Sequence, residues 1–198
     1  MRELSLHILD ALENSVEAGA TRIELHIEED LQADLLRIVI RDNGRGMSKE
    51  FVSEVLNPFV TTRKTRHVGL GLPLFAAAAQ RCNGSLRVDS EVGVGTTVTA
   101  TFEHSHIDRA PLGDIPGTLV AVLLSERPVD VYYRHRVETK SFELDTAEVR
   151  KELGAVPLSH PAVRDWLENT LAEGVADLRH PDMAEAWSPS LAQGQGRS

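Results

Sequence analysis

The chain has 198 residues, of which 41% are hydrophobic and 26% charged, a balance typical of a globular protein with a substantial core. Its formal net charge of −9 argues against a general nucleic-acid-binding protein, whose surface would be basic. No apolar run is long enough to span a membrane, the first residues do not resemble a secretory signal, and a single cysteine, Cys82, excludes an internal disulfide framework. We therefore expect a cytoplasmic protein with neither a nucleic acid nor a membrane as its partner.

The first half of the chain alternates between helical and strand patterns. Apolar residues recur every three to four positions at the start, which predicts a helix over residues 4–18. Residues 21–29 alternate between apolar and polar, and residues 35–42 are more fully apolar, so both segments are predicted strands. The remaining expected elements are a short helix over 48–56, an irregular loop over 57–68, a helix over 71–81 and a hairpin with strands at 85–90 and 96–104. This order favours helices on one face of a mainly antiparallel sheet, a two-layer α+β sandwich.

Beyond residue 107 the pattern changes. A connector rich in proline and glycine, residues 108–117, leads into an apolar segment, residues 119–124, that fits either a helix or a strand. The elements expected after it are strands at 129–137 and 141–144, a helix opened by the capping box of Asp145 and Glu148 and stopped by Gly154, a helix capped by Ser159 and ended by Gly174, and a disordered tail. We therefore expect a domain over residues 1–107, a small α+β extension over 108–178 and a tail over 179–198.

The negative charge is unevenly distributed. Residues 55–88 contain no carboxylate and five basic side chains, and Arg63 and Lys64 among them precede the glycine pair Gly69 and Gly71. A basic, glycine-rich loop that leads into a helix is typical of phosphate-binding sites. Chance clustering on a solvated surface is the simpler alternative. We favour a local anion site.

Two motifs carry side-chain oxygen atoms that could bind a ligand, one on the first predicted helix and one at the end of the second predicted strand. Asp10 and Asn14 lie one helical turn apart, away from the apolar face, where their oxygens could hold a hydrated Mg²⁺ ion. Asp42 ends a predicted strand, so its carboxylate could accept a hydrogen bond from an exocyclic amine such as that of adenine. Gly44 and Gly46 follow it and would let the backbone approach a flat ligand closely. A solvated pair and an ordinary turn are the alternatives for these two motifs.

Two further glycine motifs follow along the chain. Gly69, Leu70, Gly71 and Leu72 open a predicted helix, whose first backbone N–H groups would face a phosphate. The turn of the predicted hairpin ends at Thr96, which could support a nucleotide in addition to forming the turn. Each motif alone is modest evidence, but all four occur in one order on compatible secondary structure.

In this order the motifs resemble those of the GHKL superfamily of ATPases, which includes DNA gyrase, a heat-shock chaperone, histidine kinases and a mismatch-repair ATPase. DALENSVEAGAT is similar to the N box of the superfamily, RDNGRGM to its first glycine box, PFVTTRKTRHVGLGLPL to the second glycine box with the ATP lid, and GVGTTVTATF to its last motif. The similarity covers residues 3–102. It implies a Bergerat ATP-binding fold.

The resemblance also implies roles for individual residues, with ATP and Mg²⁺ as the cofactors. Asn14 would ligate Mg²⁺, and Asp42 would accept the adenine amino group. The other residues implied in ATP binding are Gly44, Gly46 and Met47 near the base, Thr96 at the adenine end, Gly69, Leu70, Gly71 and Leu72 around the phosphates, and Arg63 and Lys64 in the lid.

Two positions depart from the pattern of the superfamily. Asp10 stands where hydrolytic members have a glutamate general base and kinases usually have asparagine, so we expect slow hydrolysis with Asp10 as the catalytic base. His67 stands where the second glycine box more often has its first glycine, which affects the expected lid conformation.

Three activities are compatible with these residues. The first is a slow ATPase that acts as a nucleotide-dependent switch on a partner protein. The second is a protein kinase acting in trans, since no segment resembles the phospho-accepting domain of a histidine kinase. The third is a non-enzymatic nucleotide-binding adaptor. The segment 104–114, HSHIDRAPLGD, resembles a small family of free-standing bacterial ATP-binding proteins, and this association alone suggests a redox enzyme or a regulator as the partner.

Overall fold

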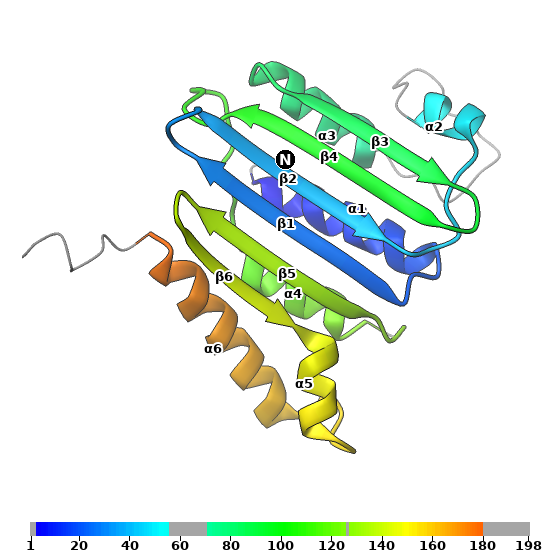
Figure 1. The fold of residues 1–198 in the computed structure, drawn as a ribbon, viewed down its shortest axis with the longest axis vertical. Helices are drawn as coiled ribbons and strands as arrows, with labels where there is room; N and C mark the ends of the chain where they lie inside the picture. Colours follow the sequence, from blue (N-terminus) through cyan, green and yellow to red (C-terminus); the bar gives the residue numbers. More distant parts are fainter. Residues whose placement is uncertain (1–2, 56–70, 126, 180–198) are drawn as a thin grey trace, which may run out of the picture.

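The computed structural model describes residues 3–55, 71–125 and 127–179, which form one six-stranded sheet with helices on one face (Figure 1). The strand order is β3-β4-β2-β1-β5-β6, and every neighbouring pair is antiparallel except β1 and β5. The predicted two-layer α+β sandwich is therefore confirmed. No helix in these residues is long and apolar enough to cross a membrane.

The elements of the first half lie within one or two residues of their predicted bounds. They are α1 (Leu4–Glu17), β1 (Arg22–Asp30), β2 (Leu35–Asp42), α2 (Lys49–Val55), α3 (Gly71–Arg81), β3 (Ser85–Glu91) and β4 (Gly95–Glu103). Residues 57–68, the predicted loop, lie outside the described residues.

The core lies between the sheet and α1, α3 and α4, which run behind it in Figure 1. Ile8 and Leu12 on α1 are fully buried, as is Phe75 on α3, whose ring contacts Phe102 of β4 at 6.1 Å between centroids. Alternate side chains of β1 and β2 point to this face and are buried there. The core therefore fixes α1 beneath the end of β2.

The second half extends the same sheet and adds helices to the same layer. Its elements are α4 (Ile115–Leu123), β5 (Asp130–Val137), β6 (Lys140–Asp145), α5 (Thr146–Leu153) and α6 (Pro161–Asp177). The apolar segment 119–124, whose sequence fitted either a helix or a strand, belongs to helix α4 as far as Leu123. The Asp114 side chain caps this helix by accepting a hydrogen bond from the Gly117 N–H. Asp145 caps α5 as predicted, accepting the Ala147 N–H at 2.9 Å. The division of the chain at residue 107 remains a prediction.

Two predictions for α6 are wrong. The residue before the helix is His160 rather than Ser159, and it makes no side-chain cap; Pro161 begins the helix with a φ angle already suited to it. Gly174 does not end the helix, which continues to Asp177. A Cβ atom at Gly174 would lie 2.2 Å from the ring of Phe142 in β6, so this glycine allows close packing of α6 on the sheet.

A buried carboxylate joins the two halves where β1 runs beside β5. Glu29 is 6% exposed, and its two oxygens accept hydrogen bonds from Nε2 of His135 at 2.8 Å and Nε2 of His104 at 2.9 Å. Burial alone would raise the pKa of Glu29, but these bonds from His135 and His104 outweigh it and lower the pKa to about 2. Glu29 is therefore ionised in the folded chain over the whole physiological pH range.

This lowered pKa predicts an acid-dependent loss of stability. The pKa of Glu29 is lowered on folding, so its contribution is fully present above pH 4.5 and is lost as the pH falls towards about 2. We expect the difference in unfolding free energy between wild type and Glu29→Gln, measured by urea denaturation, to shrink over that interval. A difference that stays constant from pH 7 to pH 2.5 would contradict this assignment.

Candidate functional site

The polar face of α1 carries the first two predicted site residues. Asp10 and Asn14 are both partly exposed and lie one turn apart, while Ile8 and Leu12 face the core. Burial raises the pKa of Asp10, because a partly desolvated carboxylate is less stable in its charged form. The helix thus presents a carboxylate of increased basicity beside an amide oxygen.

The start of α3 approaches this carboxylate. A Cβ atom at Gly71 would lie 3.0 Å from the Asp10 Cβ and 3.2 Å from its Oδ2, so only a glycine permits this approach without a shift. The first N–H groups of α3 therefore lie close to Asp10, at the positive end of the helix dipole. Leu72 is buried in the core and anchors this end of the helix. Four other predicted site residues, Arg63, Lys64, Gly69 and Leu70, lie outside the described residues.

Asp42, at the end of β2, is held by two donors. Its Oδ2 accepts a hydrogen bond from Ser15 Oγ at 2.8 Å, and its Oδ1 accepts one from the Gly44 N–H at 2.8 Å. Gly44 is buried, and a Cβ atom there would come within 2.9 Å of the Cβ of Ala18, the C-cap residue of α1. The carboxylate is therefore fixed beside α1, and each of its two oxygens accepts one hydrogen bond from the protein.

Sequence reasoning missed Ser15. This serine is 4% exposed and lies on the inner side of α1, next to Asn14 and four residues after the buried Ala11. A polar residue at a core-facing helix position needs a hydrogen-bond partner, which is a signal that the sequence contains. The identity of that partner, Asp42, depends on the packing of α1 beneath β2 and is not visible in the spacing.

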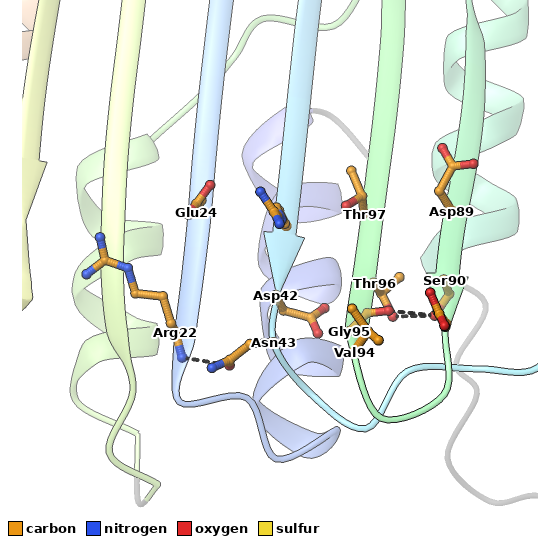
Figure 2. A pocket seen from close by; sticks show the side chains of 12 residues that line it. Arg22, Glu24, Asp42, Asn43, Asp89, Ser90, Val94, Gly95, Thr96 and Thr97 are labelled. Carbon is orange, nitrogen blue, oxygen red and sulfur yellow. Dashed lines mark hydrogen bonds between the residues drawn. The ribbon is translucent and has the colours of Figure 1, made fainter.

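The loop after Asp42 is held against the end of β3. Ser90 Oγ accepts the Met47 N–H at 2.8 Å and lies 2.9 Å from Thr96 Oγ1, and Figure 2 shows this last contact. Gly46, with φ of +66°, lies so close to β3 that a Cβ atom there would be 1.9 Å from the Glu91 carbonyl oxygen. Thr96 is also the cross-strand neighbour of Asp42. The first and last predicted glycine motifs thus form one unit at this end of the sheet.

The close approach at Gly46 predicts the effect of a single methyl group. Gly46→Ala adds a collision with backbone to a left-handed conformation, and we expect it to lower the unfolding free energy by about 2–4 kcal/mol. Gly93→Ala is the matched control: its φ is +80° but nothing lies within 4 Å of the added atom, so about 1 kcal/mol is expected. Thermal or urea unfolding measures both. Equal losses in the two variants would show that the contact with Glu91 is unimportant.

A cavity of about 440 Å³ lies beside Asp42 on the other face of the sheet (Figure 2). Arg41, Glu24 and Thr97 line it, and they alternate along their strands with residues of the core, so they point away from α1. Asp42 is at the boundary, since it lines this cavity and also binds Ser15 on α1. Asp10 and Asn14 do not line this cavity.

The predicted residues that the structure describes therefore gather at one end of the sheet. Asp10, Asn14 and Gly71 lie together around α1 and the start of α3, and Asp42 connects this group to Thr96. Among the described residues no group of three or more histidine, cysteine or carboxylate side chains could hold a metal ion by itself. An ion at this site would need oxygens from a ligand as well as from the protein.

Comparison with known proteins gives this arrangement a family. Residues 2–106 match the family described as histidine kinase-, DNA gyrase B- and HSP90-like ATPase. The chain is 33% identical over 102 residues to the sensor histidine kinase WalK of Bacillus subtilis, covering 49% of this chain and 16% of that protein. It is 35% identical over 93 residues to sporulation kinase D of Bacillus subtilis, covering 47% and 17%.

These relatives are much longer proteins, and the chain spans less than a fifth of their length. A solved N-terminal domain of a DNA repair protein aligns with 73% of this chain at 13% identity and a TM-score of 0.48. The family match covers more than half of the chain and includes all the predicted motifs. The chain belongs to the family of histidine kinase-, DNA gyrase B- and HSP90-like ATPases.

Proposed function

We propose that this chain binds Mg-ATP at the end of the sheet formed by Asp42 and α1, hydrolyses it slowly, and acts as a nucleotide-dependent switch on a partner protein. The observation that carries the proposal is the fixed carboxylate of Asp42, which Ser15 and Gly44 hold beside the helix face of Asp10 and Asn14. A carboxylate held in one orientation can select an amino group at a defined position, as adenine recognition requires.

The base-binding part of the proposed site consists of residues around Asp42. Asp42 would accept a hydrogen bond from the adenine amino group. Gly44 and Gly46 would line the base pocket. A Cβ atom at either position would come too close to neighbouring protein atoms, so the local backbone packing requires glycine there. Met47 and Thr96, joined through Ser90, would complete the pocket at the adenine end.

The phosphate-binding part would lie between α1 and α3. Asn14 would offer its amide oxygen to Mg²⁺, an ion that favours oxygen ligands and retains waters, and the phosphates would supply further oxygens. Gly71 and Leu72 would place the first N–H groups of α3 near the phosphates. The family resemblance adds Gly69, Leu70, Arg63 and Lys64 to this set as predictions.

Asp10 would act as the general base for hydrolysis. Its raised pKa favours proton acceptance, and its place beside the α3 start would bring it close to the γ-phosphate. The aspartate side chain is one methylene shorter than the glutamate that the resemblance implies for hydrolytic members of the superfamily, so water would be held less closely. Slow turnover is the expected consequence.

A protein kinase acting in trans is the second candidate, and the observation in its favour is that the named relatives are sensor and sporulation kinases. The γ-phosphate would then pass to a side chain of another protein. A non-enzymatic adaptor that only binds the nucleotide is the third candidate. The partner suggested by family association is a redox enzyme or a regulator.

Incubation with γ-labelled ATP and Mg²⁺ distinguishes the three candidates. Free labelled phosphate that disappears in Asp10→Asn supports the slow ATPase, and Asn14→Ala should lose activity together with Mg²⁺-dependent binding. Label that appears only on a co-purified protein supports the kinase instead. Nucleotide binding without either product would leave the adaptor, and would contradict the proposed hydrolysis.

A further inference from the structure

A second cavity, of about 600 Å³, lies at the end of the sheet opposite Asp42. Glu29, which lines it, is six residues along β1 from Ile23, the cross-strand neighbour of Asp42, so ~20 Å separate the two ends. Its walls come from both halves of the chain: the segment after β4, the turn between β5 and β6, and the residues that follow α6. The volume is in the range of sites for small molecules.

The buried carboxylate in this cavity is already engaged. Both oxygens of Glu29 accept imidazole N–H groups, from His104 and His135, and His135 Nδ1 lies 3.0 Å from the Tyr133 hydroxyl. Glu138, the other acidic residue of the lining, accepts the Leu31 backbone N–H. The two carboxylates of the cavity therefore serve the fold, and neither is available in full to a cationic ligand.

Two arginines of the lining can donate hydrogen bonds to a ligand. Arg109 is held in place because its Nε donates to the His104 carbonyl and its Nη1 to the Ala110 carbonyl, which uses two of the five N–H donors of a guanidinium. Arg179 lies at the exposed rim, with its Nη2 3.7 Å from Oε1 of Glu29. Guanidinium groups bind carboxylates and phosphates through paired hydrogen bonds. Because Arg109 is held in place before binding, its side chain would lose little conformational entropy when an anion binds.

Much of the remaining wall is apolar, although Thr139 and Lys140 also belong to it. Leu112 and Val137 line the cavity, and backbone hydrogen bonds from Leu4 and Ser5 to the Pro111 and Leu112 carbonyls, at 2.9 and 2.7 Å, fix this wall to α1. Leu31 at the rim is 52% exposed. Apolar walls with a few convergent donors are typical of sites for small organic ligands.

We propose that this cavity is a second ligand site that takes a small organic anion, with a carboxylate or phosphate group held by Arg109 and Arg179 and a short carbon body against Leu112 and Val137. The site lies away from the residues assigned to ATP and does not depend on that assignment. Because its walls join the segment after β4 to the second half of the chain, occupancy would tie the two halves together.

Titration of the labelled chain with defined probes, followed by amide NMR shifts, tests this site directly. Hexanoate and hexyl phosphate have the same carbon body and different anionic groups, and hexylamine reverses the charge. We expect saturable shifts at Leu112, Gly113 and Thr139 with an anionic probe at millimolar concentration, and a weaker response or none with hexylamine. The tighter of the two anions identifies the head group that the site prefers.

The variant Arg179→Gln should weaken binding of the preferred anion about tenfold, because a charge-assisted hydrogen bond to the anion is lost. Arg179 is exposed, and Glu29, its ion-pair partner at 3.7 Å, keeps its hydrogen bonds to His104 and His135 in the variant. Arg87→Gln, at an exposed arginine on the far edge strand β3, is the matched control and should bind like wild type. Absence of saturable shifts with both anions, equal binding of hexylamine, or an Arg179→Gln affinity equal to that of Arg87→Gln would overturn the proposal. ATP binding is measured separately, so either proposal can fail alone.

Discussion

An Asp42→Asn variant is expected to bind ATP about 10- to 100-fold more weakly than wild type, the largest effect of any single substitution on binding. The carboxylate is the proposed acceptor for the adenine amino group, and a charged acceptor contributes about 1.5–3 kcal/mol. An asparagine in its place would also present an N–H₂ group either to adenine or to the donors on Ser15 and Gly44. Isothermal titration calorimetry with ATP measures the change.

The matched control for Asp42 is Asp165→Asn, which makes the same chemical change at an exposed position on α6. It should bind ATP like wild type. Unfolding curves of both variants establish that each chain is folded before binding is compared. An Asp42→Asn chain that is folded and binds ATP as tightly as the control would remove adenine recognition from Asp42.

An Asp10→Asn variant is expected to lose hydrolysis by about 100-fold or more while it still binds ATP. General-base catalysis contributes about 10²–10⁴-fold, and asparagine keeps the size of the side chain but cannot accept the proton. The raised pKa of Asp10 and its closeness to Gly71 are the structural reasons to expect this role. Release of labelled phosphate under single-turnover conditions measures the loss.

The companion variant Asp10→Glu tests the effect of side-chain length. The longer side chain should hold the attacking water closer to the γ-phosphate and raise the rate above that of wild type, if ATP affinity is unchanged. A rate in Asp10→Asn equal to that of wild type would exclude Asp10 as the base. Loss of ATP binding in Asp10→Asn would instead assign Asp10 to the binding of the nucleotide.

Much of the fold follows from local pattern. The helix over residues 71–81 has its predicted bounds, since Gly71 begins it, alanines fill its centre and Asn83 with Gly84 follow its end. The β3–β4 hairpin was predictable for a similar reason, because its strands alternate and its turn contains two glycines. These features act over a few residues, so the sequence alone reveals them.

Contacts between distant segments could not be predicted in the same way. The apolar residues of β5 indicated a buried strand, but they did not specify which strand it would pair with. It lies parallel to β1, where Val131 pairs with Ile23, a residue 108 positions earlier in the chain. Glu29 stands at a core-facing position of β1, which signals an unusual buried charge, yet its partners His104 and His135 are 75 and 106 residues away. Gly174 was predicted to end a helix because glycine often does so. Its actual role, close packing against Phe142, depends on a distant segment that the local sequence does not reveal.

The same distinction between local motifs and distant contacts applies to the candidate site. Asp10, Asn14, Asp42 and Thr96 were predicted because each lies in a short motif. The structure places them towards one end of the sheet, and their roles remain predictions. Ser15 and Ser90 were missed because their roles come from packing: one fixes Asp42, and the other joins the two glycine motifs. The predicted lid residues lie outside the described residues and remain predictions.

Calorimetric titration of the wild-type chain with ATP, with and without Mg²⁺, tests the central claim most directly. We expect saturable binding of one ATP per chain that Mg²⁺ strengthens and ADP competes with. A folded chain that shows no saturable binding at millimolar ATP in the presence of Mg²⁺ would contradict the proposed nucleotide site.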